Sequence, residues 1–286
     1  MTRRYDITGS GGVRLSVCEY GDPEGPPILF LHGYAQSRWC WSQQVNDPVL
    51  SGFRLVTFDH RGHGRSDKPD DPDAYNDSRL WAQDVAAIID QAGLAGCVIA
   101  VWSYSGLILC DYLRAYGDTA LTGINLVAAR TLVGNDKARA MSGTLFLELV
   151  PGFCSQDAVE REAAVRRFLE HLTAGPIPDP DFYTMLGYNL AVPPHVCAAM
   201  LDRQADNDEV LAKISVPVLL NHGDADTSVL LVMAEHNAAL ISRADLFVYA
   251  DIGHAPFYED APRFNRELAT FVSKCTDVSS SRVTER

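Results

Sequence analysis

Residues 97–106 read C-V-I-A-V-W-S-Y-S-G, an apolar run that stops abruptly at a serine and continues in small residues. The pattern predicts a buried strand that turns sharply into a helix, with Ser103 held at the apex of the turn. Such a turn is strained, and it presents the serine hydroxyl beyond the end of the strand. The stretch is therefore typical of a nucleophile elbow.

Two serines of this stretch compete for the nucleophilic role. Ser103 has Ser105 at +2, which satisfies the need for a small residue there, although Val101 stands at −2 where a glycine is usual. Ser105 would have the bulky Leu107 at +2 and would lie further into the helix. The elbow rule favours Ser103 and leaves Ser105 as the alternative. A plain helix N-cap would also explain the serine taken alone.

Short apolar runs and helical patterns alternate along the chain on both sides of this stretch. The order predicts an α/β fold with a mainly parallel sheet flanked by helices. The strand-like runs are residues 13–20, 28–31, 54–58, 97–102, 123–128, 216–221 and 246–249. Helical spacing of apolar residues marks residues 39–46, 79–91, 106–116, 230–241 and 262–274.

The alternation breaks between residues 131 and 207. This segment has no strand-like run, and residues 155–172 and 195–203 have amphipathic helical patterns. We therefore expect a helical cap, residues 131–207, inserted into a core formed by residues 1–130 and 208–275. The polar residues 276–286 are expected to form a frayed, disordered tail.

A carboxylate and a histidine follow the last two strands. The run 216–221 leads into H-G-D-A-D, in which Asp226 is the carboxylate that can orient an imidazole; Asp224 is the alternative, although it suits the turn itself better. The run 246–249 leads into D-I-G-H-A-P-F, which contains His254. Ser103, Asp226 and His254 each follow the carboxyl end of a strand, in the order serine, acid, histidine. Other histidines are expected to be structural, namely His32, His171, His195, His222 and His236.

Backbone donors for an oxyanion are expected at two turns. The run 28–31 ends in L-H-G-Y, where Gly33 permits a sharp turn and the N–H of Tyr34 becomes available. The second donor is the N–H of Tyr104, directly after the proposed nucleophile. Taken alone, L-H-G-Y would be only a strand-ending turn.

Five motifs in register resemble the α/β-hydrolase superfamily: F-L-H-G-Y, D-H-R-G-H-G-R-S-D (residues 59–67), the Ser103 elbow, H-G-D-A-D and G-H-A-P-F. The resemblance covers residues 13–130 and 210–274. It is closest to the small serine hydrolases with a helical lid, which include esterases, lactonases and cofactor-free haloperoxidases or perhydrolases. The resemblance implies the α/β-hydrolase fold and a Ser103–His254–Asp226 triad.

The same resemblance helps to decide whether residues 59–64 form a metal site. His60 and His63 have a His-x-x-His spacing that suggests a metal site, but no third ligand beyond Asp59 is evident. In the superfamily this segment is a structural loop, in which Arg61 is expected to bind carbonyl groups. No metal is therefore expected.

The implied reaction is cleavage of a carboxylic ester or lactone through an acyl-enzyme on Ser103. Relatives with an aspartate at the elbow, the epoxide hydrolases and haloalkane dehalogenases, are excluded by the serine. Carbon–carbon bond hydrolases, perhydrolases and receptor-like ligand-binding members with little turnover also have the triad, so they remain alternatives. No cofactor is expected, because the chain itself supplies every group that the mechanism needs.

The substrate pocket is expected to have aromatic walls. Candidates for the walls are Trp39, Trp102, Phe146, Phe153, Tyr183 and Tyr188, which could equally form the cap's own core. Arg130 stands at the end of the strand before the cap. It suits either an acidic group on a substrate or, more simply, an ion pair between cap and core.

Composition limits the partners. The 286 residues contain 24 Lys and Arg against 37 Asp and Glu, a net charge of −13. A chain this acidic repels nucleic acid and anionic membrane surfaces, so binding to either is not expected. No apolar run is long enough to span a membrane. The seven cysteines are scattered and lack C-x-x-C spacing, which predicts reduced, packed thiols. A cytoplasmic protein acting on a small ester or lactone is expected.

Overall fold

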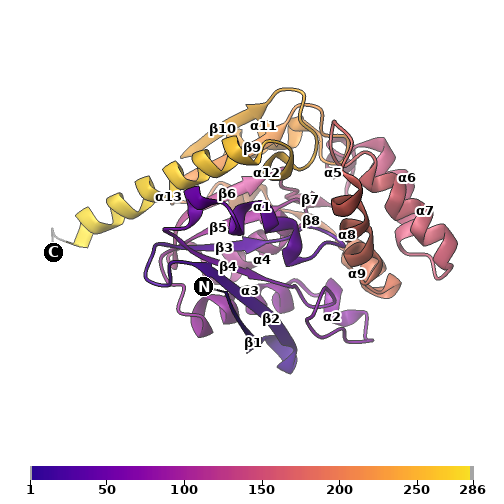
Figure 1. Cartoon of the computed structure of the whole chain (residues 1–286), viewed down its shortest axis with the longest axis horizontal. Helices are drawn as coiled ribbons and strands as arrows, with labels where there is room; N and C mark the ends of the chain where they lie inside the picture. The colour runs from indigo at the N-terminus through magenta and orange to yellow at the C-terminus, as the bar shows by residue number, and fades with distance from the viewer. Residues whose placement is uncertain (1, 284–286) are drawn as a thin grey trace.

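The computed structural model describes the backbone of residues 2–283 and the side chains up to residue 276. Its centre is an eight-stranded sheet in the order β1-β2-β4-β3-β5-β6-β9-β10 (Figure 1). The strands are β1 Arg3–Thr8, β2 Arg14–Gly21, β3 Pro27–Leu31, β4 Arg54–Phe58, β5 Cys97–Trp102, β6 Leu121–Val127, β9 Val218–Gly223 and β10 Ala244–Tyr249. β1 and β2 are antiparallel to their neighbours, and every pairing from β4 to β10 is parallel.

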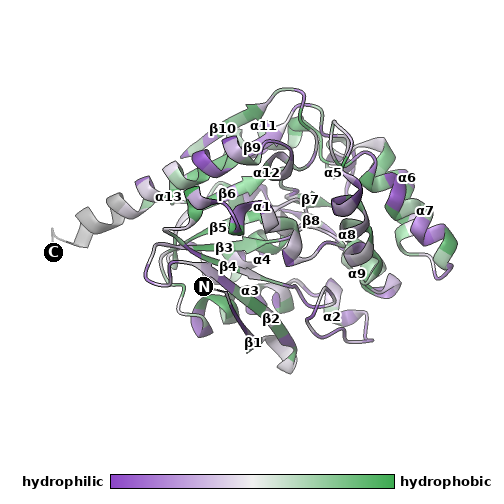
Figure 2. Ribbon diagram, viewed as in Figure 1, coloured by the Kyte–Doolittle hydropathy of each residue, from purple (hydrophilic) through white to green (hydrophobic). Residues whose placement is uncertain are grey.

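Helices cover both faces of the sheet, and the central strands β3 and β5 are apolar along their whole length (Figure 2). All six residues of β5 are buried. On one face α3 (Ser78–Gln91) packs against α4 (Ser105–Tyr116). On the other face lie α1 (Ser42–Val45) and α13 (Ala261–Val283), which packs against β6. The mainly parallel α/β sheet predicted from the alternation is confirmed.

The segment between β6 and β9 is a helical insertion, which Figure 1 shows gathered at one end of the molecule. Its helices are α5 Asp136–Ala140, α6 Thr144–Phe153, α7 Ala158–Leu169, α8 Asp179–Leu190 and α9 Pro194–Leu201. Two short strands, β7 (Leu132–Val133) and β8 (Ala205–Asp206), pair antiparallel at its base and do not join the central sheet. The sequence had predicted no strand here, because two residues are too few to give a recognisable alternation.

The remaining helices are short connectors, apart from α11 (Leu231–Leu240) between β9 and β10. The connectors are η1 Ser10–Gly12, η2 Arg38–Trp41, η3 Pro48–Leu50, α2 Asp73–Asn76, α10 Asp208–Leu211 and α12 Pro256–Glu259. The single helix expected over residues 39–46 is thus divided between η2 and α1. All seven cysteines are free thiols, and Cys154 alone is partly exposed.

Both ends of the chain differ from expectation. β1 was not predicted, because as an edge strand with mostly exposed residues it lacks a buried alternating face. The tail expected to fray from residue 276 continues instead as helix α13 to Val283. Extending an existing helix is much easier than starting one, and this explains the difference. Residues 284–286 lie outside the described part. Among the described residues, no helix combines the length and apolar character needed to cross a membrane.

Candidate active site

The turn after β5 has the geometry of a strained elbow. Ser103 has a φ of 55°, a value that residues with a side chain rarely adopt. Its N–H donates to Val127 O at 3.0 Å, and its carbonyl accepts from the N–H of Gly106 at 2.9 Å. A side chain at Gly106 would bring a Cβ within 2.5 Å of Arg130 O, so glycine is required there. The backbone thus presents the Ser103 side chain at the carboxyl edge of the sheet.

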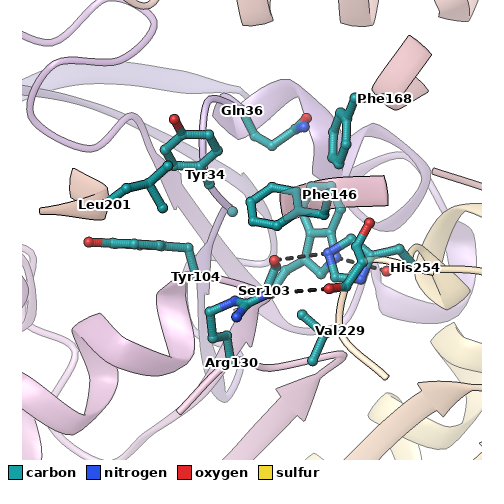
Figure 3. Close-up of a pocket in the computed structure, with 13 residues that line it drawn as sticks. Tyr34, Gln36, Ser103, Tyr104, Arg130, Phe146, Phe168, Leu201, Val229 and His254 are labelled. Atoms are coloured by element: carbon teal, nitrogen blue, oxygen red, sulfur yellow. Dashed lines mark hydrogen bonds between the residues drawn. The ribbon is translucent and has the colours of Figure 1, made fainter. Parts of the chain in front are cut away.

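Ser103, His254 and Asp226, each predicted from the sequence, form a hydrogen-bonded row. His254 Nε2 lies 2.9 Å from Ser103 Oγ (Figure 3), and His254 Nδ1 lies 2.6 Å from Asp226 Oδ2. The His254 backbone is held from two sides: its N–H donates to Leu172 O at 2.8 Å, and its carbonyl accepts from the Trp102 indole at 2.9 Å. The histidine is therefore fixed between the core and the insertion.

The Asp226 carboxylate is fully paired. Oδ1 accepts the N–H groups of Ser228 and Val229 at 2.7 and 3.0 Å. Oδ2, besides its bond to His254, lies 3.2 Å from His222 Nε2. Burial by itself would raise the pKa of Asp226, but the two histidines outweigh burial and hold the pKa well below its ordinary value. Asp226 is therefore an ionised partner for His254.

The alternative carboxylate, Asp224, has a different role. It is exposed, and its Oδ1 accepts the N–H of Asp251 at 2.8 Å. This bond ties the loop after β9 to the loop after β10. Asp224 does not bond its own turn, as the sequence suggested, and it does not reach His254.

Ser105, the alternative nucleophile, points away from the pocket. It is fully buried, donates to His32 O, and lies 2.9 Å from His60 Nε2. Ser103 is the serine that lines the cavity. The geometry therefore favours Ser103 as the group that can meet a ligand.

The two amides predicted to bind an oxyanion both belong to residues that line the cavity beside Ser103. Within the described chain, neither the Tyr34 N–H nor the Tyr104 N–H donates to a protein acceptor. Tyr104 directly precedes helix α4, so its amide lies at the positive end of the helix dipole. Gly33 lets the backbone before Tyr34 pass close to Ser103, because a Cβ at residue 33 would lie only 3.2 Å from Ser103 Cβ.

The cavity over Ser103 is mostly apolar and takes its walls from core and insertion together (Figure 3). It is lined by Gly33, Tyr34, Gln36, Trp102, Ser103, Tyr104, Arg130, Phe146, Phe168, Leu201, Ser228, Val229 and His254. Three predicted wall residues, Trp102, Arg130 and Phe146, are in this set. Gln36, Phe168, Leu201 and Val229 were not predicted, because their place depends on how the insertion packs and on loop conformation.

The other predicted wall residues lie elsewhere. Trp39 and Tyr183 are 50% and 59% exposed, and Trp39 lies beneath the Arg38 guanidinium. Phe153 is buried between the rings of Tyr34 and Phe168, so it packs between the main core and the insertion, outside the cavity lining. Tyr188 is packed against the main core, outside the cavity lining.

Arg130 does not form the ion pair that the sequence favoured. Among the described residues, no Asp or Glu carboxylate lies within 4.0 Å of its guanidinium. Its Nη1 donates to Ser142 Oγ at 2.6 Å and its Nη2 to Ser228 O at 3.2 Å. The guanidinium also lies over the Phe146 ring, at 5.3 Å from the ring centre. The insertion presents a hydroxyl and an aromatic face to Arg130 where a carboxylate was expected.

The histidines of the 59–64 loop are engaged inside the protein. His60 Nε2 faces Ser105, and His63 Nδ1 lies 2.8 Å from Arg61 O. Burial lowers the pKa of His60 to about 3 and that of His63 to about 4. Arg61 bonds two carbonyl oxygens, as predicted, and also pairs with Asp84 at 2.6 Å. No group of three potential metal ligands gathers in the described residues.

Comparisons with known proteins agree with this architecture. A family model described as "alpha/beta hydrolase fold" matches residues 26–261. The esterase RhEst1 from Rhodococcus sp. ECU1013 superposes with a TM-score of 0.88 at 35% identity, covering 94% of this chain and 98% of RhEst1. The bifunctional esterase/perhydrolase DCH of Acinetobacter calcoaceticus is 27% identical over 93% of this chain and 98% of its own. The enol-lactonase of Burkholderia xenovorans LB400 shares the fold, with a TM-score of 0.78 at 20% identity over 95% of this chain and all of the enol-lactonase.

Proposed function

Because the chain belongs to the alpha/beta hydrolase fold family, we propose that it is a serine hydrolase that cleaves carboxylic esters or lactones through an acyl-enzyme intermediate. The observation that carries this proposal is the 2.9 Å approach of His254 Nε2 to Ser103 Oγ inside a cavity lined by both residues. The similarity to esterases over almost the whole chain supports the same reaction class.

In the first step, His254 Nε2 takes the proton of Ser103 as Oγ attacks the acyl carbon. The imidazole then carries a positive charge, which the ionised Asp226 stabilises through Nδ1. Asp226 also selects the tautomer that leaves Nε2 free to accept. Its two backbone hydrogen bonds keep the carboxylate from turning away from His254.

The attack places a negative charge on the former carbonyl oxygen. The free N–H groups of Tyr34 and Tyr104 are the donors proposed to receive it. His254 then gives its proton to the alkoxide leaving group, and the acyl group remains on Ser103. Water, deprotonated by His254, attacks the acyl-enzyme; collapse of the second intermediate returns the proton to Ser103 and frees the acid. Besides the substrate and water, every group in these steps belongs to the chain, so the proposed mechanism requires no metal or cofactor.

Residues 131–207 are proposed to act as a cap that selects the substrate. Phe146, Phe168 and Leu201 come from this segment and form part of the cavity wall around the elbow. A hydrolytic core with a separate insertion wall lets substrate choice vary without changes in the reacting groups.

Perhydrolysis is the second candidate, favoured by the similarity to a bifunctional esterase/perhydrolase. It would use the same acyl-enzyme, with hydrogen peroxide in place of water as the attacking group, and would yield a peracid. The two activities are separated by adding peroxide to the ester assay and measuring the peracid formed.

The direct test is labelling with a fluorophosphonate probe, combined with an aryl-ester assay. We expect one adduct, on Ser103, and hydrolysis of phenyl acetate that Ser103→Ala abolishes together with labelling. Absence of both labelling and hydrolysis in a folded protein would favour a ligand-binding role. Labelling with binding but negligible turnover would indicate a receptor-like member.

A further inference from the structure

Arg130 is a buried charge that, among the described residues, has no carboxylate within 4.0 Å. It is 6% exposed, and its two hydrogen bonds go to a hydroxyl and one carbonyl. Other buried arginines are matched: Arg38, Arg61 and Arg203 each pair with an aspartate, and Arg161 bonds three carbonyls near the end of α8. Burying a charge without a counter-charge is costly. Arg130 therefore has neither a paired aspartate nor a set of three carbonyl acceptors, and it is the one of these five arginines that lines the cavity over Ser103.

The Arg130 side chain borders the cavity in which a ligand of Ser103 would bind. Arg130 lines the cavity over Ser103, and its N–H donates to Ser103 O at 2.9 Å, so it stands directly beside the elbow. Figure 3 shows its side chain next to Ser103. The guanidinium has five N–H donors, of which two are used here: Nε makes no protein hydrogen bond, and Nη1 and Nη2 make one each.

A second cavity, of about 190 Å³, adjoins the first. Arg130, Phe146 and Leu201 line both cavities, so they form the partition between them. The rest of the second cavity's lining is mainly apolar, with Val133, Ala138, Leu147 and Val150, and includes Arg139. In the part of the chain that the structure describes, no Asp or Glu lines either cavity.

The charge of these linings is opposite to that of the chain. The chain carries a net charge of −13, yet the charged groups in the two linings, apart from the titratable His254, are Arg130 and Arg139. Burial lowers the pKa of Arg130 to about 10, against an opposing influence of Asp226, so the group stays positive at neutral pH. Asp226 lies outside both linings and is already paired with His254 and His222. The charged side chains that a ligand in these cavities would meet are therefore cationic, which favours an anionic ligand.

We propose that the substrate carries a carboxylate besides its ester or lactone group, and that Arg130 binds this carboxylate. The inference rests on the proposed function for the reaction at Ser103, and it adds the substrate class. A guanidinium matches a carboxylate with two parallel N–H···O bonds, which a neutral ester group cannot reproduce. Half-esters of dicarboxylic acids, and lactones with a carboxylate side chain, belong to this class.

The test compares charged and neutral esters of equal length. Monophenyl succinate, glutarate and adipate are each paired with the corresponding methyl phenyl diester, and phenol release is measured after subtracting the rate without enzyme. In the best pair, we expect kcat/KM for the half-ester to exceed that for the diester by about 10- to 100-fold, the range for a hydrogen bond between charged groups. A diester that is cleaved as well as its half-ester at every length would overturn the inference.

Substitutions at Arg130 test whether this residue causes the preference for half-esters over diesters. Arg130→Met should lose most of the half-ester preference, and Arg130→Lys should retain part of it. The matched control is Arg167→Met, which removes the same charge from an exposed position on α7 outside both cavities and should keep the wild-type ratio. If the Arg167 variant lost the ratio equally, the overall charge and not Arg130 would be responsible.

Binding measurements test the role of Arg130 independently of the proposed hydrolase activity. In Ser103→Ala, calorimetry with the same pairs measures affinity without turnover, and the half-ester should bind about 10-fold or more tightly than its diester. Equal affinities would refute the role of Arg130 even if the wild-type protein labels at Ser103 and cleaves phenyl acetate. Conversely, tighter half-ester binding without labelling or turnover would retain the anion site and refute the hydrolase. These measurements also hold if Arg130→Met fails to fold.

Discussion

His60 Nε2 lies 2.9 Å from Ser105 Oγ, so the elbow carries a serine–histidine pair besides the one formed by Ser103 and His254. The Nε2–Oγ distance is 2.9 Å in both pairs, but Ser105 is fully buried whereas Ser103 lines the cavity. Ser105 already donates to His32 O, and burial keeps His60 neutral by lowering its pKa to about 3. A nucleophile needs access and a base that can become charged. The pair on the cavity side has access and a carboxylate behind its histidine, whereas the buried pair connects β3, β4 and α4.

Ser105→Ala should therefore leave the site of labelling unchanged. We expect the fluorophosphonate adduct to stay on Ser103, while the free energy of unfolding falls by about 1–3 kcal/mol because His60 and the His32 carbonyl lose a buried partner. Peptide mapping and urea unfolding measure the two effects. An adduct that disappears in the folded Ser105 variant would transfer the nucleophilic role to Ser105.

Asp226→Asn should lower kcat for aryl esters by roughly three to four orders of magnitude with the fold retained. The amide cannot stabilise a positive imidazole, and it can hold His254 in the wrong tautomer. Asp224→Asn is the matched control, because an amide oxygen can still accept the Asp251 N–H and kcat should change little. A larger loss in the Asp224 variant would reverse the assignment of the acid.

Phe146→Ala should shift the preference of the enzyme toward longer acyl chains. Phe146 belongs to the partition between the two cavities, and its removal should join them. Each additional methylene buried there contributes about 0.8 kcal/mol, or about fourfold in kcat/KM. The measurement is a series of phenyl esters from acetate to octanoate. Tyr183→Ala, at a ring that is 59% exposed on the same insertion, should leave the chain-length profile unchanged.

The three central side chains were predictable because each follows the carboxyl end of a strand in a parallel sheet. Parallel strands end at one edge, so Ser103, Asp226 and His254 had to meet there once the strand order was right. The elbow serine was identifiable from the change of residue size along residues 97–106. Neither inference required knowledge of how helices pack.

The wall of the cavity was much less predictable. Phe146, Phe153 and Phe168 all lie in the helical insertion, yet Phe153 packs between the rings of Tyr34 and Phe168 while the other two line the cavity over Ser103. Helical periodicity assigns a side chain to an apolar face and does not say whether a helix or a cavity lies opposite. The hydrogen-bond partners of Arg130 could not be predicted for the same reason, because the packing of the insertion brings Ser142 next to it.

Three buried histidines predict how stability depends on pH. His32, His60 and His63 are at most 2% exposed. Burial lowers their pKa values: to about 3 for His60, to about 4 for His63, and well below the ordinary value for His32. In the unfolded chain, each ring regains a pKa of about 6.5. Below that pH, the unfolded state therefore binds protons that the folded state does not.

The sign follows from proton linkage: the free energy of unfolding should fall as pH falls below about 6.5, with each histidine contributing about 1.4 kcal/mol per pH unit until its folded pKa is reached. Asp111, whose pKa burial raises to about 6, acts in the opposite direction, so a variant is more informative than the total slope. In His63→Gln, urea unfolding should show a slope flatter by about 1.4 kcal/mol per unit between about pH 4.5 and 6, and an unchanged slope above about pH 7.5. Parallel curves for wild type and variant throughout this range would mean that His63 binds its proton equally well in both states.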